Sequence, residues 1–185
     1  ELQEGVSTQE MKVSKLEEEY NNTASRLSSG LRFDYATPGK SFDRKSVRGV
    51  VANLITVREP DASTSLEVAA GGKLYAVVVD TAENAKKVLT KGKLKRRVTI
   101  IPMDKMSSKR LQTQRMDAGT SMYPSKVRTA ISLVGYPDEL EGAMRHVFGS
   151  TLVCDTLDIA KKVTFHQSVK LRSVTLEGDS VDPSG

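Results

Sequence analysis

The 185-residue sequence has a single cysteine, Cys154, and no tryptophan. One cysteine excludes an internal disulfide framework and fits a reducing compartment. No apolar run approaches the roughly 18 residues that a transmembrane helix requires, so a membrane-spanning helix is excluded. The N-terminal stretch ELQEGVSTQE has neither a basic region nor an apolar core, and is therefore not a secretory signal. Because no Met stands at the start, we expect the sequence to be an excised fragment.

Groups that carry catalysis are also scarce. The two histidines, His146 and His166, stand far apart, and with one cysteine they suggest neither a metal site nor a catalytic triad. Cys154 lies in the apolar stretch LVCD, which favours a buried core thiol over a nucleophile. Clustered carboxylates occur only in EEE at 17–19 and at predicted helix starts. The sequence therefore predicts no enzyme and no cofactor.

Two glycine patterns resemble nucleotide-binding motifs without their context. The stretch GKS at 39–41 would need a glycine at position 34, which is Asp34, and Pro38 lies inside the turn. Gly71 and Gly72 follow a predicted helix and precede a predicted strand, which is the reverse of a dinucleotide-binding loop. A positive φ, or the close approach of another backbone, explains these two glycines better.

The first thirty residues carry a heptad pattern. Apolar side chains recur in steps of three and four beside the charged stretch KLEEEY. The pattern predicts a coiled-coil arm over residues 1–30, with a surface amphipathic helix as the alternative. The apolar positions are Leu2, Val6, Val13, Leu16, Tyr20 and Leu27, and the polar interruptions are Gln9 and Thr23.

The rest of the chain reads as an α/β protein (mixed α+β) made of two similar half-domains. Each half-domain has the predicted order β-α-β-α-β, with parallel strands joined through helices. Neither half, at about 60 residues, is expected to be stable alone, so the two should pack together. The predicted boundaries are a connecting loop over 31–46, half-domain one over 47–110, a linker over 111–126 and half-domain two over 127–185.

A nine-residue stretch occurs twice, once in each half. DTAENAKKV at 80–88 returns as DTLDIAKKV at 155–163, each time at a predicted strand-to-helix corner. Asp80 is expected to cap the first helix, with Glu83 completing a capping box, and Asp155 the second. A cap of this kind contributes about 1 kcal/mol.

Positive charge is in excess, with 28 basic against 23 acidic residues. The densest stretch is KGKLKRR, which can neutralise nucleic-acid phosphates or form a solvated helix end, and both readings stay open. It has no interleaved aromatic residues, so base stacking is not predicted. The five positive residues are Lys91, Lys93, Lys95, Arg96 and Arg97, and a second basic group holds Arg32, Lys40, Arg44, Lys45 and Arg48.

Several stretches together resemble the hinge domain of the structural maintenance of chromosomes (SMC) family, and within it the condensin branch. They are FDYATPGKSFDRKSVRGVVANLI, LEVAAGGKLYAVVVDTAENAKKVL, LKRRVTIIPMDKM and VFGSTLVCDTLDIAKKV with RSVTLEGDSVDPSG. The resemblance implies a non-catalytic dimerisation module that pairs with the hinge of a second, different condensin SMC subunit. It also implies weak, sequence-independent DNA binding, and location in the nucleus, on chromosomes and in the cytoplasm.

The resemblance further implies that two hinges join at their sheet edges. The strand after the double glycine in one half would meet the glycine-containing tail of the partner's other half. The implied dimer residues are Gly71, Gly72, Leu74, Tyr75, Gly178, Asp179 and Gly185. The alternative is a basic α/β domain whose main task is nucleic-acid binding, with dimerisation incidental.

Overall fold

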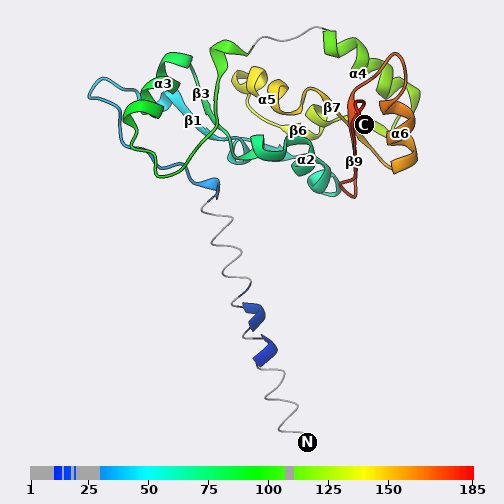
Figure 1. Ribbon diagram of the computed structural model, residues 1–185, viewed down its shortest axis with the longest axis horizontal. Helices are drawn as coiled ribbons and strands as arrows, with labels where there is room; N and C mark the ends of the chain where they lie inside the picture. The colour runs from blue at the N-terminus through cyan, green and yellow to red at the C-terminus, as the bar shows by residue number, and fades with distance from the viewer. Residues whose placement is uncertain (1–10, 14, 18, 20–29, 107–110) are drawn as a thin grey trace, which may run out of the picture. The chain divides into compact units, whose positions relative to one another are not determined.

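A computed structural model describes residues 11–13, 15–17, 19, 30–106 and 111–185 (Figure 1). The chain forms two units, Glu1–Asp34 and Tyr35–Gly185. In the first unit the described residues between 11 and 19 are helical, and Val13 and Leu16 are exposed. The other heptad positions (Leu2, Val6, Gln9, Tyr20, Thr23 and Leu27) lie outside the described residues, so the coiled-coil arm stays a prediction.

The second unit begins with half-domain one. Its helices α2 and α3 end where glycines follow, Gly71 and Gly92, as the sequence predicts. The strand predicted after Gly71 and Gly72 starts only at Val77, because residues 71–75 form a 3-10 helix. The elements are η1 (Arg44–Ser46), β1 (Val47–Val50), η2 (Val51–Asn53), β2 (Thr56–Val57), η3 (Pro60–Ala62), α2 (Ser63–Ala70), η4 (Gly71–Tyr75), β3 (Val77–Val79), α3 (Ala82–Lys91), β4 (Ile100–Pro102) and η5 (Met103–Lys105).

Half-domain two repeats this order and extends it at both ends. A helix, α4, precedes its first strand, and a short strand, β9, follows its last. The elements are α4 (Leu111–Met122), β5 (Val127–Thr129), η6 (Ala130–Leu133), β6 (Val134–Gly135), η7 (Asp138–Leu140), α5 (Glu141–Phe148), β7 (Thr151–Cys154), α6 (Leu157–Thr164), β8 (Arg172–Thr175) and β9 (Ser180–Val181).

Each half-domain builds a small mixed sheet. The strand orders are β1-β3-β4 and β5-β7-β8-β9. The predicted parallel pairs are confirmed for β3–β4 and β7–β8, which are joined through α3 and α6. The first strand of each half is antiparallel to its neighbour instead. The chain turns through a 3-10 helix and a two-residue strand before α2 or α5, so the predicted all-parallel arrangement is wrong for β1 and β5.

Those two-residue strands join the half-domains. β2 and β6 pair antiparallel, with Thr56 opposite Gly135 and Val57 opposite Val134. Two ion pairs cross the same boundary, Arg48 with Glu139 at 2.9 Å and Arg128 with Glu59. In both, an arginine of the first strand of one half meets a glutamate near the η3 or η7 turn of the other.

One core runs through both half-domains. Leu66 and Ala69 of α2 pack with Val147 of α5, Val153 of β7 and Val174 of β8. Figure 1 shows the resulting arrangement, with α2, α5 and β6 in the middle of the globular unit, α3 at one end and α6 with β9 at the other. The predicted packing of two similar halves is therefore what the structure contains.

The other face of the β5-β7-β8-β9 sheet carries a second core. Leu152 and Cys154 alternate with Val153 along β7, so they point to the opposite side of the sheet. There they meet Val163 of α6 and Met116 of α4. Burial on both faces explains why the strand reads as an unbroken apolar run.

Residues 111–126, predicted as a linker, contain α4 and the turn after it. Gly119 of α4 is buried, and a Cβ at this position would lie 2.6 Å from Cδ1 of Leu152. The glycine thus lets the helix approach β7 closely.

The helix caps differ from the prediction. Thr81 and Thr156, not Asp80 and Asp155, are the N-cap residues, and their hydroxyls accept from the N–H groups of Asn84 and Ile159 at 3.2 and 3.4 Å. Asp80 instead accepts from the Asn84 side chain, and Asp155 from Arg128. The predicted capping box is also absent, because Glu83 pairs with Lys87 four residues on.

Candidate dimer interface and basic surface

The first predicted contact segment, Gly71–Tyr75, forms the exposed η4 turn. It begins at a glycine with φ +52°, a backbone conformation that favours glycine. The Tyr75 side chain is 42% exposed, while the residue that follows, Ala76, is fully buried. Lys73 donates from Nζ to the carbonyl of His146, which ties the turn to α5 of the other half (3.2 Å).

The second segment is the tail that follows β8. The chain reverses through Gly178, whose φ is +99°, and returns as β9. Thr175 N–H donates to the Asp179 carbonyl at 2.8 Å, and Asp179 N–H donates to the Thr175 hydroxyl at 2.9 Å. Gly185 has φ +103°, and its N–H donates to the Asp182 carbonyl. The predicted tail residues therefore frame a hairpin strand at the edge of the sheet.

Both segments adjoin α2. A Cβ on Gly178 would lie 3.1 Å from Cγ2 of Thr64 and 3.5 Å from Cγ2 of Val68, so the tail turn packs on this helix. Arg172 of β8 donates to the Val68 carbonyl at 3.2 Å. Because α2 runs directly into Gly71, the two predicted segments lie at the same helix within one chain.

The unpaired strand edges differ from those implied by the resemblance. β3, the strand after the double glycine, is the central strand of its sheet, so both of its edges are already paired. Only the η4 turn before it is open to solvent. β4 and β9 are the terminal strands beyond the parallel pairs, and among the described residues their outer sides pair with no strand.

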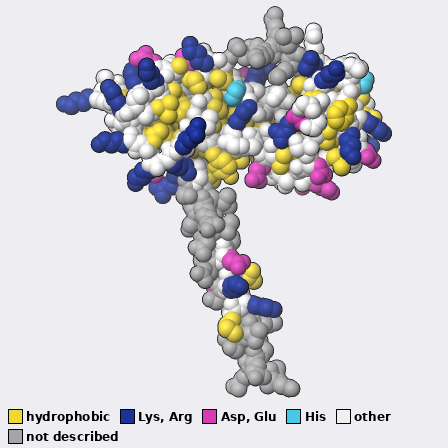
Figure 2. Space-filling model, viewed as in Figure 1, with side chains coloured by type: hydrophobic (Ala, Val, Ile, Leu, Met, Phe, Trp, Pro, Cys, Tyr) yellow, Lys and Arg dark blue, Asp and Glu magenta, His cyan; other side chains and the backbone are white. Residues whose placement is uncertain are grey.

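The basic stretch is a loop between α3 and β4. Lys93, Lys95 and Arg97 are all exposed, and Lys93 has φ +49°. Lys91, the last residue of α3, is also exposed, as is Arg96. Figure 2 shows Lys and Arg side chains gathered at the end of the globular unit that carries α3.

Part of the second basic group joins this loop. The Ala36 N–H donates to the Gly92 carbonyl at 2.8 Å, which fixes the 35–46 segment beside the end of α3. Asn84 of α3 also donates to the Ser46 hydroxyl at 3.1 Å. Lys40, Lys45 and Arg44, all exposed, therefore share one end of the globular unit with the 91–97 stretch.

Aromatic side chains lie in the 35–46 segment. The sequence of residues 91–97 alone did not predict aromatic residues beside the basic stretch. The rings of Tyr35 and Phe42 meet edge to face at a centroid distance of 6.3 Å. The guanidinium carbon of Arg44 lies 4.8 Å from the Tyr35 ring centroid. The sequence signal for them was the alternation of aromatic and basic residues over 32–48. It bears on the 91–97 stretch only because the fold brings the two segments together.

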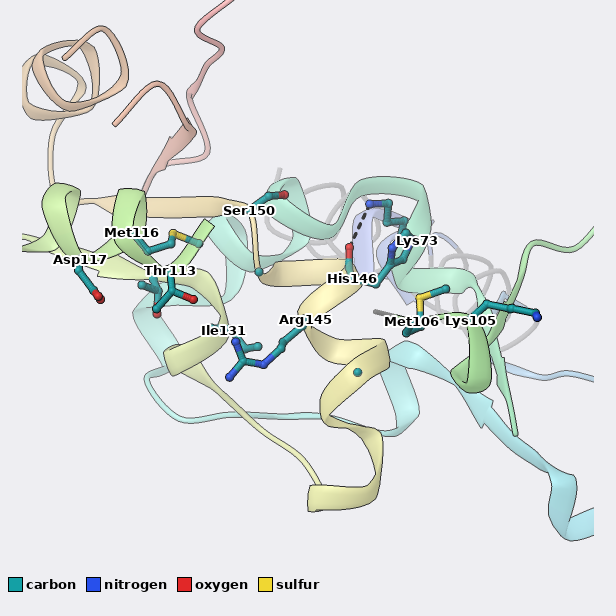
Figure 3. A pocket seen from close by; sticks show the side chains of 13 residues that line it. Lys73, Lys105, Met106, Thr113, Met116, Asp117, Ile131, Arg145, His146 and Ser150 are labelled. Carbon is teal, nitrogen blue, oxygen red and sulfur yellow. Dashed lines mark hydrogen bonds between the residues drawn. The ribbon is translucent and has the colours of Figure 1, made fainter. Parts of the chain in front are cut away.

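A cavity of about 430 Å³ lies between the half-domains. Its wall takes Met116 and Asp117 from α4, Arg145 and His146 from α5, and Lys73 from η4. Figure 3 shows Arg145 reaching from α5 toward Ile131, while Lys73 sits beside the His146 carbonyl. No motif in the sequence predicted this cavity, because its walls come from segments far apart in the chain.

Burial and neighbouring groups shift the pKa values of the ionisable side chains beside the cavity. Burial, with Lys73 nearby, lowers the pKa of His146. Burial and a hydrogen bond to Glu141 raise the pKa of Tyr136 to about 12. The same bond lowers the pKa of Glu141, with Arg145 adding to the effect. His146 has no carboxylate or hydroxyl partner among the described residues.

Cys154 is fully buried, as predicted, and burial raises its pKa to about 11. A thiol held protonated is a poor nucleophile. Among the described residues no group of His, Cys, Asp and Glu could hold a metal ion. Within the same part of the chain, no helix is both long and apolar enough to cross a membrane.

The globular unit thus consists of two mixed sheets packed on one core, with a duplicated order of elements. Residues 44–164 match the family described as SMC proteins Flexible Hinge Domain. The chain belongs to this SMC hinge family. The hinge is a non-catalytic module, so the prediction that the chain is not an enzyme is confirmed by its family.

Relatives and solved structures agree with this assignment. The chain is 52% identical over 157 residues to structural maintenance of chromosomes protein 2 of Schizosaccharomyces pombe, covering 84% of this chain and 13% of that protein. It is 45% identical over 174 residues to the Homo sapiens protein of the same name, covering 94% and 14%. The sequence thus spans about one seventh of these relatives.

Among solved structures, an asymmetric dimer of the Geobacillus stearothermophilus SMC hinge domain is similar, with a TM-score of 0.65 and 29% identity. That match covers 76% of this chain and 56% of the other. The Pyrococcus furiosus SMC hinge domain matches with a TM-score of 0.59 and 26% identity, covering 76% and 70%. These matches confirm the predicted fold class.

Proposed function

We propose that this hinge joins its SMC subunit to a second, different SMC subunit of a condensin-type complex. The complex organises chromosomes in the nucleus, and the subunit is also present in the cytoplasm. The partner hinge contacts the η4 turn through Gly71, Gly72, Leu74 and Tyr75. It contacts the tail through Gly178, Asp179 and Gly185.

The observation that carries the proposal is the open edge of β9. Thr175 and Asp179 form a hydrogen-bonded pair, and Ser173 lies opposite Val181. Hydrogen-bonded and non-hydrogen-bonded pairs alternate along an antiparallel ladder, so the intervening Ser180 directs its N–H and C=O away from β8. A partner strand can satisfy these groups and extend the sheet.

Support also comes from the similar proteins. One of the matching structures is itself a dimer of SMC hinge domains. The fungal and animal relatives are named structural maintenance of chromosomes protein 2, and a plant relative is named structural maintenance of chromosomes protein 2-1. An exposed tyrosine in a turn, such as Tyr75, is typical of residues that dominate interface energies.

The deciding experiment is light scattering after size exclusion, on this chain alone and mixed with the hinge of the other condensin SMC subunit. A stable one-to-one complex is the expected result. Two separate species in the mixture would contradict the proposal.

A pair of variants at one position tests the edge itself. Ser180→Pro removes the outward N–H, whereas Ser180→Ala keeps it and removes only the hydroxyl that accepts from Arg172 (2.9 Å). We expect the proline variant to weaken the complex at least tenfold and the alanine variant to weaken it little. Equal affinities for the two, with melting temperatures matching the parent, would exclude β9 as a pairing edge.

A second pair of variants tests the turn. Tyr75→Ala should weaken partner binding by about 2 kcal/mol, or roughly thirtyfold, if the ring is buried by the partner. Phe165→Ala is the matched control, since this residue, directly after α6, is 56% exposed and belongs to neither predicted segment. The turn is not part of the interface if both variants bind alike.

A second function is weak, sequence-independent DNA binding by Lys91, Lys93, Lys95, Arg96 and Arg97. The hydrogen bond from Ala36 to Gly92 favours it, because this bond unites two basic segments at one end of the unit. Phosphate contacts of this kind depend steeply on salt.

Two triple variants carry matched charge changes. The first variant replaces three lysines of the basic stretch with Gln, namely Lys91, Lys93 and Lys95. It should lower DNA affinity and reduce the salt slope of binding by about 2 to 3. The control variant replaces Lys161, Lys162 and Lys170 with Gln. It is also matched in backbone conformation, because Lys93 and Lys170 both have a positive φ. If the first variant keeps partner binding, assembly is the primary role. Loss of partner binding together with DNA binding would favour the alternative of a nucleic-acid domain whose dimerisation is incidental.

A further inference from the structure

The 35–46 segment contains one threonine followed by proline. Thr37 is exposed and is followed by Pro38, Gly39 and Lys40. The chain has six prolines, and Pro38 is the only one preceded by a serine or threonine. A hydroxyl directly before proline, with a basic residue two positions beyond the proline, is the pattern that proline-directed protein kinases accept.

The backbone of this segment suits a kinase groove. A residue before proline is disfavoured in the helical region, so we expect Thr37 to be extended. The chain turns only beyond it, where the Phe42 N–H donates to the Gly39 carbonyl at 3.1 Å. No helix or strand has to open for the hydroxyl to reach an active site, because residues 32–37 lie in irregular backbone.

A phosphate at this position would meet a guanidinium that is already in place. Arg44 donates from one terminal nitrogen to the Thr37 hydroxyl oxygen at 2.9 Å. The same guanidinium packs over the Tyr35 ring, which holds its plane. Arginine binds phosphate through charge-assisted hydrogen bonds, and a preorganised guanidinium loses little freedom in doing so.

We propose that Thr37 is a phosphorylation site whose phosphate is bound by Arg44 and switches off the DNA contact of the basic surface. The effect on DNA rests on the proposed DNA binding, while the modification itself does not. A phosphothreonine adds about −1.5 to −2 charges at pH 7. It lies in the segment that Ala36 ties to Gly92, beside the Lys91–Arg97 stretch.

The chemistry is a phosphoryl transfer from ATP. The bond between the γ-phosphorus and the β,γ-bridging oxygen breaks, and ADP leaves with that electron pair. A new bond forms between phosphorus and Oγ1 of Thr37, and the hydroxyl proton passes to the catalytic carboxylate of the kinase. In the contact with Thr37, Arg44 is the donor and Oγ1 is the acceptor. The hydroxyl proton of Thr37 is therefore free to leave, and the contact does not block the transfer.

The test starts with a proline-directed kinase, ATP and the whole chain, followed by intact and peptide mass measurement. One phosphate on Thr37 is expected, and none on Thr37→Ala. If the chain remains unmodified while a synthetic peptide of residues 33–44 is phosphorylated under the same conditions, the site is excluded.

Phosphorus NMR then reads the Arg44 contact without any DNA. Arg44 should lower the second pKa of the phosphate below its value in the free peptide, and Arg44→Gln should restore the peptide value. An identical pKa in chain, peptide and Arg44→Gln would show that Arg44 does not bind the phosphate.

DNA titrations complete the test. The phosphorylated chain should bind DNA roughly tenfold more weakly than the unmodified chain, with a salt slope smaller by about 2. Unchanged affinity after full modification overturns the switch. If the unmodified chain does not bind DNA at all, the proposed DNA contact and the switch fail together, and the mass and NMR results alone decide the modification site.

Discussion

Half-domain one and half-domain two follow the same order of strands and helices, but they finish their sheets differently. In half-domain two, β9 pairs with the outer side of β8, and α4 and α6 cover a second core. In half-domain one, no described strand pairs with the outer side of β4, and a basic loop stands where the other half has the less charged stretch 165–171. The two halves thus agree at their strand-to-helix corners and differ at one sheet edge and one loop.

The largest expected effect concerns the packing that only half-domain two has. Gly119→Val forces two methyl groups between α4 and Leu152, which is fully buried and has no room to move. We expect a loss of about 2 to 3 kcal/mol of unfolding free energy, measured by denaturant titration. Gly39→Val, where nothing lies within 4 Å of a Cβ, should cost under about 0.5 kcal/mol. Equal losses would mean that α4 does not pack as described.

The two arginines that cross between the halves should differ next. Arg128 is 24% exposed and pairs with both Glu59 and Asp155, while Arg48 is 34% exposed and pairs with Glu139 alone. We expect Arg128→Met to cost about 1 to 2 kcal/mol and Arg48→Met about 0.5 kcal/mol of unfolding free energy. A larger loss for Arg48→Met would reverse this ranking of the two contacts.

The repeated corners should behave alike. Thr81→Ala and Thr156→Ala each remove an N-cap hydroxyl and should each cost about 1 kcal/mol by thermal or chemical unfolding. Asp158→Ala, at an exposed position in the first turn of α6, serves as the comparison and should cost less. If the threonine variants were neutral, the recurrence of Asp-Thr in both halves would need another explanation.

A pH dependence is present in one half only, and near neutral pH its effect is the smallest of these. Burial raises the pKa of Cys154 to about 11, above its value of about 8.5 in an unfolded chain. The raised pKa contributes stability that is complete below pH 8.5 and is lost as pH rises toward 11. Val79 ends the equivalent strand β3, so Cys154→Val should abolish this loss. A folded chain that reacts with a thiol reagent at pH 8 as fast as the unfolded chain does would contradict the burial.

The sequence predicted the elements whose signal is local. Helices α2, α3 and α5 follow from the glycines that end them, α6 from its likeness to the first corner, and the buried strands β3 and β7 from short apolar runs. The nine repeated residues correctly indicated two equivalent corners. The sequence placed the N-cap at Asp80, one residue before the actual cap, Thr81. Both residue types cap helices well, so only the backbone angles distinguish them.

What the sequence missed depends on distant partners. β2 and β6 have two residues each, too few for any periodicity, and each is a strand only because the other lies opposite it. α4 shows no apolar stripe, since a buried glycine, Gly119, provides its closest approach to the sheet. The interface segments stay a prediction of the family resemblance. The structure shows that β3 is a central strand and that β9 is a terminal one, and no single strand's sequence reveals its place in a sheet.

The single core that runs through both half-domains also has a mechanical meaning. Side chains of α2 interlock with those of β7, β8 and α5, and close-packed interiors are hardly compressible. A pull applied to one half-domain is therefore carried into the other through side chains as well as through the chain that connects them. We therefore expect the two halves to yield together under load and this unit to extend in a single step.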